Sequence, residues 1–133
     1  MGLTDDVYAQ LLQLRTELRR FERWSAEQAH NAGLTPMQHQ LLLAARGHAD
    51  HRGPTIGEVA DYLLLQHHSA GELIKRAEKA GLVQRVRDTA DHRIIRLELT
   101  DLGRDRLEML TSMHLEELQR LTIAPLLPQS GRS

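Results

Sequence analysis

The stretch TIGEVADYLLLQHHSAGELIKRAEKAGLVQRVRDTADHRIIRLELT, residues 55–100, decides the fold because it holds several local signals in a fixed order. TIGE at residues 55–58 is a capping box, which opens a short helix that we expect to end near Leu63. Helical residues resume near Gln66 and stop at Gly81, a residue suited to the left-handed position after a helix. A short and a longer helix with only a few residues between them predict a helix-turn-helix.

Two short strands follow this pair of helices. LVQRVR and IIRLEL flank a polar segment, and in the second of them Ile95, Leu97 and Leu99 alternate with other residues. Two such runs around a polar loop predict a β-hairpin. A hairpin directly after a helix-turn-helix is typical of a winged helix, so the expected fold is mainly α with a small β-hairpin wing.

Helices are also expected on both sides of this stretch. Thr4 precedes two aspartates and opens a first helix that runs to about Ala32, with Gly33 as its stop. TPMQ at residues 35–38 is a second capping box, with proline at the first helical position, and its helix runs to about Arg46. Thr100 and Asp101 cap a last helix.

The terminal helices carry more apolar surface than a lone winged helix can cover. Their unpartnered positions are Leu11, Leu14, Leu18, Leu110, Met113 and Leu118. A second copy of the chain is the simplest partner for such faces. We therefore expect one domain over residues 1–133, with dimerisation helices at 1–33 and 101–124, a DNA-binding lobe at 34–100 and a frayed tail at 125–133.

Composition excludes several classes of protein. The chain has 133 residues, no cysteine and 26% charged residues, which is typical of one globular domain without disulfides or thiolate metal sites. The N-terminus has no signal-peptide pattern and the apolar runs are too short to span a bilayer, so we expect a cytoplasmic protein with no membrane contact. Nucleophile, phosphate-loop and metalloprotease motifs are missing, so we expect no enzyme and no cofactor.

The charge is distributed unevenly along the chain. The formal net charge is −1, but residues 66–96 carry +3 and the rest of the chain carries −4. A local basic segment is what the phosphate backbone of a nucleic acid would contact. The sequence therefore predicts double-stranded DNA as a partner of the helix-turn-helix and its wing.

The chain resembles the MarR (multiple-antibiotic-resistance regulator) family over roughly residues 34–110. The resemblance rests on LTPMQ, TIGEVADYL, LIKRAEKAGLVQR, DHR and LELTDLGRDRL in this order and spacing. It implies a homodimeric winged helix-turn-helix transcription regulator, most often a repressor that releases a pseudo-palindromic operator when a small, often aromatic, ligand binds. It also implies a further C-terminal helix, in place of which this chain reads APLLPQSGRS.

The resemblance assigns DNA contacts to the wing. Arg93 matches the arginine of the family's D-x-R motif, which enters the minor groove, and a delocalised guanidinium suits a narrow groove. Asp91 lies two residues earlier and is expected to pair with an arginine at the base of the strands and to hold the tip rigid. Arg87 and His92 complete the predicted wing contacts. The alternative is a solvated hairpin tip with no function.

The recognition helix departs from the usual family pattern. Its expected base-reading and phosphate-contacting residues are Gln66, His67, His68, Ser69, Gly71, Glu72, Lys75 and Arg76. Gly71 would allow a close backbone approach. Glu72 would repel phosphate unless it accepts from a cytosine amine or pairs with Lys75 or Arg76. Lys79 is either a phosphate contact or a plain solvated residue.

Aromatic and histidine side chains supply the remaining candidates. Phe21, Trp24 and His39 could line a ligand pocket, although aromatic residues at helical spacing are more often core or dimer interface. Eight histidines raise the alternative of a metal-responsive regulator, with His48 and His51 or a convergence of the three residues His30, His39 and His114 as ligands. Ordinary, partly exposed histidines are preferred, so no metal site is predicted. A protein-interaction module of the same fold and a regulator without a ligand are also compatible with the sequence.

Overall fold

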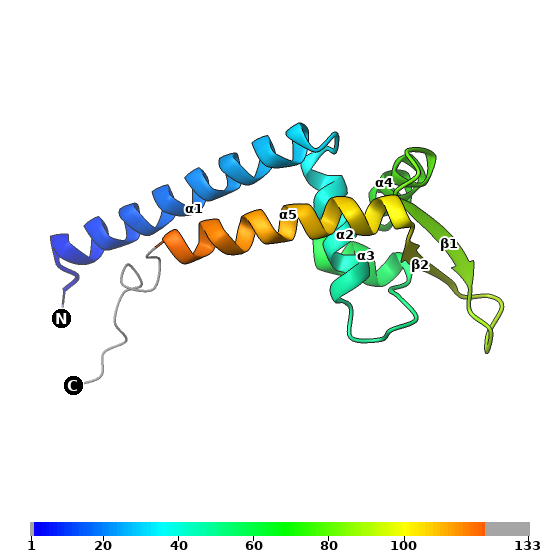
Figure 1. Ribbon diagram of the computed structural model, residues 1–133. Helices are drawn as coiled ribbons and strands as arrows, with labels where there is room; N and C mark the ends of the chain where they lie inside the picture. Colours follow the sequence, from blue (N-terminus) through cyan, green and yellow to red (C-terminus); the bar gives the residue numbers. More distant parts are fainter. Residues whose placement is uncertain (1, 122–133) are drawn as a thin grey trace.

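The computed structural model describes residues 2–121 and contains five helices and one hairpin in that range. Figure 1 shows a lobe built from the middle of the chain and two long terminal helices that extend away from it. The elements, in chain order, are α1 (Asp5–Asn31), α2 (Pro36–Gly47), α3 (Ile56–Leu63), α4 (His67–Lys79), β1 (Val83–Arg87), β2 (Ile95–Leu99) and α5 (Asp101–Arg120). The predicted winged helix-turn-helix is confirmed.

Local sequence signals explain where the helices of the lobe begin. At α2, the Thr35 hydroxyl accepts from the Gln38 amide at 3.1 Å and the Gln38 side chain accepts from the Thr35 amide at 3.0 Å. Thr55 and Glu58 form the same reciprocal pair at the start of α3. Both predicted capping boxes are therefore confirmed, and each satisfies two amides that the first helical turn leaves without a partner.

The predicted hairpin is confirmed, and its two strands pair in an antiparallel register. Val83 lies opposite Leu99, Arg87 lies opposite Ile95, and the side chains of Leu97 and Leu99 are buried. Thr55 forms an additional antiparallel bridge to Arg96, and the amide of Leu97 donates to the carbonyl of Pro54 at 2.9 Å. The segment before α3 thus adds one isolated β-bridge to the small sheet. The sequence did not predict this contact.

The core of the lobe lies where α2, α3 and α4 meet the hairpin. Leu41, Leu42, Val59 and Ile74 are fully buried there. Burial of each such side chain contributes about 1.5–3 kcal/mol. This core holds α4 against the sheet and leaves its other face in solvent.

The junction between β2 and α5 is a tight backbone contact. Thr100 is the only residue between the two elements, and its hydroxyl accepts from the Gly103 amide at 3.0 Å while donating to the Gly81 carbonyl at 2.6 Å. A Cβ atom at Gly103 would overlap the carbonyl oxygen of Leu82. Glycine at this position therefore lets the first turn of α5 lie directly on the backbone of the lobe.

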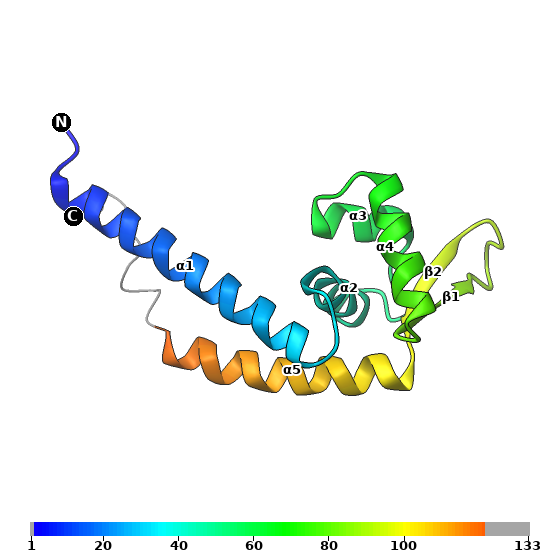
Figure 2. The same cartoon turned by 90° about the horizontal axis from the view of Figure 1, so that it is seen from above.

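Both α1 and α5 extend away from the lobe in the same direction (Figures 1 and 2). Several of their apolar side chains are exposed in the single chain. Leu11, Leu18 and Leu118 are each more than 40% exposed, as expected for faces that need a partner. Leu110 is an exception, because it is fully buried within the single chain. α5 ends at Arg120, and the predicted boundary at 124 and the predicted tail at 125–133 lie outside the described residues. No described helix has the length and hydropathy to cross a membrane.

Candidate nucleic-acid interface

Helix α4 has one buried face and one face in solvent. Ala70, Ile74 and Ala77 are buried against the core. Seven of the predicted contact residues are exposed, namely Gln66, His67, His68, Ser69, Glu72, Lys75 and Arg76, and Gly71 is half-buried. The residues that the sequence predicted as DNA contacts of this helix therefore lie on its accessible side, and Gly71 lies at the edge of that side.

The recognition helix is fixed next to the hairpin. α4 runs beside β1 in both views (Figures 1 and 2), and Glu78 at the end of α4 pairs with Arg85 of β1 at 3.3 Å. This contact joins the two elements that the sequence assigned to DNA binding. The end of α4 and the first strand of the wing are therefore held next to each other.

Two residues near the start of α4 determine how closely a partner can approach. A Cβ atom at Gly71 would have no atom within 4 Å, so the fold itself does not require glycine there. Within residues 2–121, Glu72 makes no ion pair with Lys75 or Arg76, so its carboxylate stays available as an acceptor. Of the two alternatives for Glu72, pairing with Lys75 or Arg76 is therefore not observed, and acceptance from a base amine stays a prediction.

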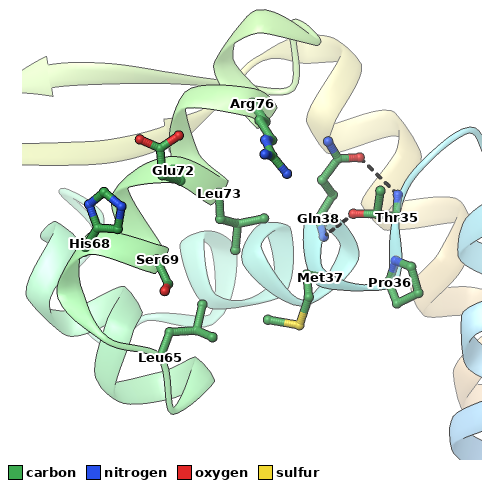
Figure 3. A pocket seen from close by; sticks show the side chains of 10 residues that line it. All are labelled: Thr35, Pro36, Met37, Gln38, Leu65, His68, Ser69, Glu72, Leu73 and Arg76. Atoms are coloured by element: carbon green, nitrogen blue, oxygen red, sulfur yellow. Dashed lines mark hydrogen bonds between the residues drawn. The ribbon is translucent and has the colours of Figure 1, made fainter.

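A groove of about 630 Å³ separates the N-terminus of α2 from the middle of α4 (Figure 3). The capping pair Thr35 and Gln38 forms one wall, and Ser69, Glu72 and Arg76 of α4 contribute to the other. None of the residues predicted to bind a ligand lines this groove. It belongs instead to the surface that carries the expected DNA contacts.

The wing tip presents one arginine in a fixed geometry. The Arg93 side chain is 91% exposed, and its Nε and Nη2 atoms each donate to the Asp91 carboxylate at 3.0 Å. Hydrogen bonds from the Arg93 side chain and backbone lower the pKa of Asp91. Asp91 was expected to pair with an arginine at the base of the strands, and that expectation is wrong. Its partner is Arg93 itself, because the turn folds the two side chains onto each other.

The other two predicted wing residues meet in the same turn. Arg87 donates from Nη1 to the carbonyl oxygen of His92 at 2.7 Å. Both side chains are exposed, but the guanidinium of Arg87 is partly used in closing the loop. Arg87 therefore supports the shape of the wing in addition to contributing charge.

The carboxylate that pairs with a strand arginine is Asp88. It accepts from Nε of Arg96 at 2.7 Å, and its side chain is only 2% exposed. Hydrogen bonds from Arg96, and from the amide of Ala90, lower the pKa of Asp88 to about 2. In the sequence, Asp88 and Arg96 stand out only as charges. The hairpin register could have shown that they are neighbours, because the Asp88 amide bonds to Ile94.

The predicted ligand-binding residues gather where α1, α2 and α5 meet. The ring of His114 lies 4.8 Å from the rings of both Trp24 and His39, and Phe21 stacks on Trp24 at 6.0 Å. Ser25 donates to Nε2 of His114 at 2.6 Å, while Nδ1 of His114 donates to the Leu110 carbonyl. Trp24 borders a cavity of about 510 Å³ between α1 and α5, which neither Phe21 nor His39 lines.

His39 is the one poorly partnered member of this group. Its side chain is buried, and its Nδ1 atom has no hydrogen-bond partner in the described part of the chain. Burial, and to a smaller degree the neighbouring His114, lower the pKa of His39. At neutral pH the imidazole is therefore uncharged.

The histidines considered as metal ligands do not form a cluster. His39 and His114 are adjacent, but His30 is exposed on α1. His48 bonds to the Tyr62 hydroxyl at 2.7 Å, and the side chain of His51 is almost fully exposed. Within residues 2–121 no group of three or more histidine, aspartate or glutamate side chains could hold a metal ion.

Comparisons with known proteins agree with this architecture. The MarR family model matches residues 32–94. A MarR family protein from Bacillus stearothermophilus is 25% identical with a TM-score of 0.76, over 90% of this chain and 81% of that one. AbsC from Streptomyces coelicolor is 20% identical with a TM-score of 0.73, over 96% and 86%. An S. aureus MepR–DNA complex is 22% identical with a TM-score of 0.69, over 96% and 88%.

Curated protein sequences gave no significant match. The family match covers the helix-turn-helix and the wing up to Ile94, which are the elements that carry the candidate interface. The surrounding fold, including both long helices, is shared with the MarR structures. Residues 32–94 therefore match the MarR family of transcription regulators, and the described chain as a whole has the fold of MarR structures.

Proposed function

We propose that the chain works as a homodimer that binds a pseudo-palindromic operator and represses transcription until a small ligand releases it. The observation that carries the proposal is the joint exposure of the polar face of α4 and of the Arg93 guanidinium on elements that pack together. The similar MepR structure in complex with DNA supports the same use of this fold.

The second copy is supported by the bare apolar faces of α1 and α5. Leu11 and Leu18 belong to the N-terminal part of α1, and Leu118 belongs to the last turn of α5. These ends of the two helices extend beyond the lobe (Figure 1). Two lobes related by a two-fold axis would place two α4 helices in successive major grooves, with half-sites about one helical turn apart. We therefore assign dimerisation to the segments 1–33 and 101–124 and DNA binding to 34–100.

Release by a ligand requires a bound state in which the two lobes no longer fit both grooves. The aromatic group around Trp24 and His114 lies between α2, which belongs to the lobe, and the long helices. A small aromatic ligand at this junction would alter the angle between lobe and dimer helices. Phe21, Trp24 and His39 are the residues that we propose to sense it.

Fluorescence anisotropy on DNA from upstream of the gene tests the proposal. We expect a steep loss of affinity with salt, and at least a hundredfold preference over a scrambled duplex. Arg93→Ala should weaken binding to the upstream duplex by about 1–3 kcal/mol. The matched control is Arg19→Ala, which removes an exposed arginine from α1 and should leave the affinity unchanged.

Two results would contradict the proposal. Equal, weak binding to both duplexes would mean that this DNA holds no operator or that the wing does not contribute to specificity. A complete lack of DNA binding would favour the protein-interaction module.

A further inference from the structure

The base of the wing contains a buried carboxylate with four hydrogen-bond donors around it. Asp88 accepts from Nε of Arg96 at 2.7 Å and lies 3.5 Å from Nη1 of Arg52. The amides of Ala90 and Asp91 donate to its other oxygen at 2.7 and 3.3 Å. These amides belong to the turn that carries Arg93. One carboxylate oxygen of Asp88 thus accepts hydrogen bonds from the wing turn, and the other accepts them from the two arginines.

Arg96 continues this network toward the loop before α3. Its side chain is only 12% exposed, and its Nη1 atom donates to the carbonyl of Gly53 at 2.9 Å. Asp50 of the same loop pairs with Arg52 at 2.7 Å. Backbone contacts add to these side-chain bonds, since Thr55 bridges to Arg96. The loop and the wing are therefore tied together although they lie far apart in sequence.

The charges of this network cancel internally. Two aspartates face two arginines, so little net charge remains for phosphate, whereas Arg93 at the tip is almost fully exposed. The strands end at Arg87 and Ile95, and the turn beyond them projects from the lobe (Figure 1). Asp88 is the first residue of that turn. Its bonds fix the direction in which the turn leaves the sheet.

We infer that Asp88 and Arg96 are positioning residues for DNA binding, which lock the wing to the loop at 50–55 so that Arg93 meets the minor groove at a fixed angle. The inference rests on the proposed function, because it assumes that Arg93 contacts DNA. A narrow minor groove attracts arginine only if the guanidinium arrives at the correct depth. The lock therefore contributes to specificity through Arg93 and not through a contact of its own.

A double-mutant cycle separates this role from a general loss of structure. The variants are Asp88→Asn, Arg93→Ala and the double variant, measured by anisotropy on the upstream duplex with thermal melts of each protein. We expect Asp88→Asn to weaken binding about tenfold, and to have less than about a twofold effect once Arg93 is alanine. Asp105→Asn, an exposed aspartate of α5, is the matched control and should change nothing.

A second measurement uses two duplexes that differ only in the base pairs expected under the wing. These base pairs form an A-tract in one duplex and a G·C segment in the other. The wild-type protein should prefer the A-tract duplex, and both Asp88→Asn and Arg93→Ala should lose most of this preference. A variant that is merely less folded would weaken binding to both duplexes equally. Arg96→Lys is the substitute variant if Asp88→Asn does not fold. Its lysine keeps the charge but cannot reach both Asp88 and Gly53, so this variant should show an intermediate preference for the A-tract duplex.

The outcomes distinguish the two proposals. If Arg93→Ala has no effect on either duplex, the wing does not contact DNA and the proposed function loses this element. If Arg93→Ala weakens binding but Asp88→Asn and Arg96→Lys do not, the lock is overturned while the function stands. The lock is also overturned if Asp88→Asn weakens DNA binding by the same factor in the wild-type protein and in the Arg93→Ala variant.

Discussion

Asp88 and His39 are both buried within residues 2–121, and their surroundings differ. Asp88 at the base of the wing accepts hydrogen bonds from two arginines and two amides, whereas Nδ1 of His39 has no partner within residues 2–121. A buried polar group without a partner costs about 1–3 kcal/mol, and a satisfied one does not. The wing is therefore anchored by completed bonds, while the junction between the lobe and the long helices keeps an incomplete one.

The difference indicates which part of the molecule can change shape at low cost. Moving the wing would break several charge-assisted bonds at once. Moving the junction would cost His39 no hydrogen bond at Nδ1 and could give it one from water. For the proposed repressor, which would have to bind DNA and also release it, the wing would then stay rigid while the junction moves.

The largest effect is expected from breaking the completed network through its backbone. Gly53 has φ +93°, and a Cβ atom there would overlap the carbonyl oxygen of Leu97. Gly53→Ala should lower the free energy of unfolding by about 2–4 kcal/mol, measured by chemical denaturation. Gly71→Ala, in a helix with open space around it, is the control and should raise stability by about 0.5–1 kcal/mol. If Gly53→Ala left the free energy of unfolding unchanged, the backbone at Gly53 would not be in close contact with Leu97 of β2.

A smaller effect of opposite sign is expected at the incomplete site. His39→Leu removes the unpartnered nitrogen and keeps an apolar side chain of similar size, so the free energy of unfolding at pH 7.5 should rise by about 1 kcal/mol. His30→Leu changes an exposed histidine and should give no such gain. Destabilisation by His39→Leu would show that Nδ1 of His39 has a hydrogen-bond partner in solution.

The smallest effect is expected from a change of pH. It distinguishes His39 from Asp88 because the two side chains titrate in different pH ranges. The folded-state pKa of His39 is lowered, so the unfolded chain binds the proton more readily and stability should fall as pH drops through 6.5. The slope for one proton cannot exceed about 1.4 kcal/mol per pH unit. The pKa of Asp88 is also lowered, from 3.8 to about 2, so its contribution is lost only between about pH 4 and 2.

Unfolding curves between about pH 2 and 8 provide the measurement, with His39→Leu as the control. The variant should lose the part of the slope that belongs to His39 and keep the acid transition. An unchanged slope in His39→Leu would assign the titration near neutral pH to another histidine.

Predictions from sequence succeeded where the interaction is local. Thr35 with Gln38 and Thr55 with Glu58 are three residues apart, so their spacing alone located two helix starts. Gly33 and Gly81 adopt the positive φ angles expected after a helix. The alternation of Ile95, Leu97 and Leu99 located the second strand of the hairpin.

Predictions failed where partners are distant in sequence. Arg52 and Asp88 are 36 residues apart and Ser25 and His114 are 89 apart, so no spacing rule brings them together. The pairing of Asp91 was assigned to the wrong arginine because the shape of the turn depends on Asp88. At Leu64, a non-glycine residue takes the left-handed position after α3, which a search for glycine stop signals cannot find.

The single-residue junction at Thr100 has a mechanical consequence. Helix α5 starts on the backbone of the lobe at Gly103 and is 20 residues long, which makes it a rod of about 30 Å without a flexible linker at its inner end. A tilt of about 5° at that end displaces the far end by about 3 Å. One inserted residue would lengthen the rod by about 1.5 Å and rotate its outer face by about 100°. In the proposed homodimer, the length of α5 would therefore help to set the distance between the two lobes.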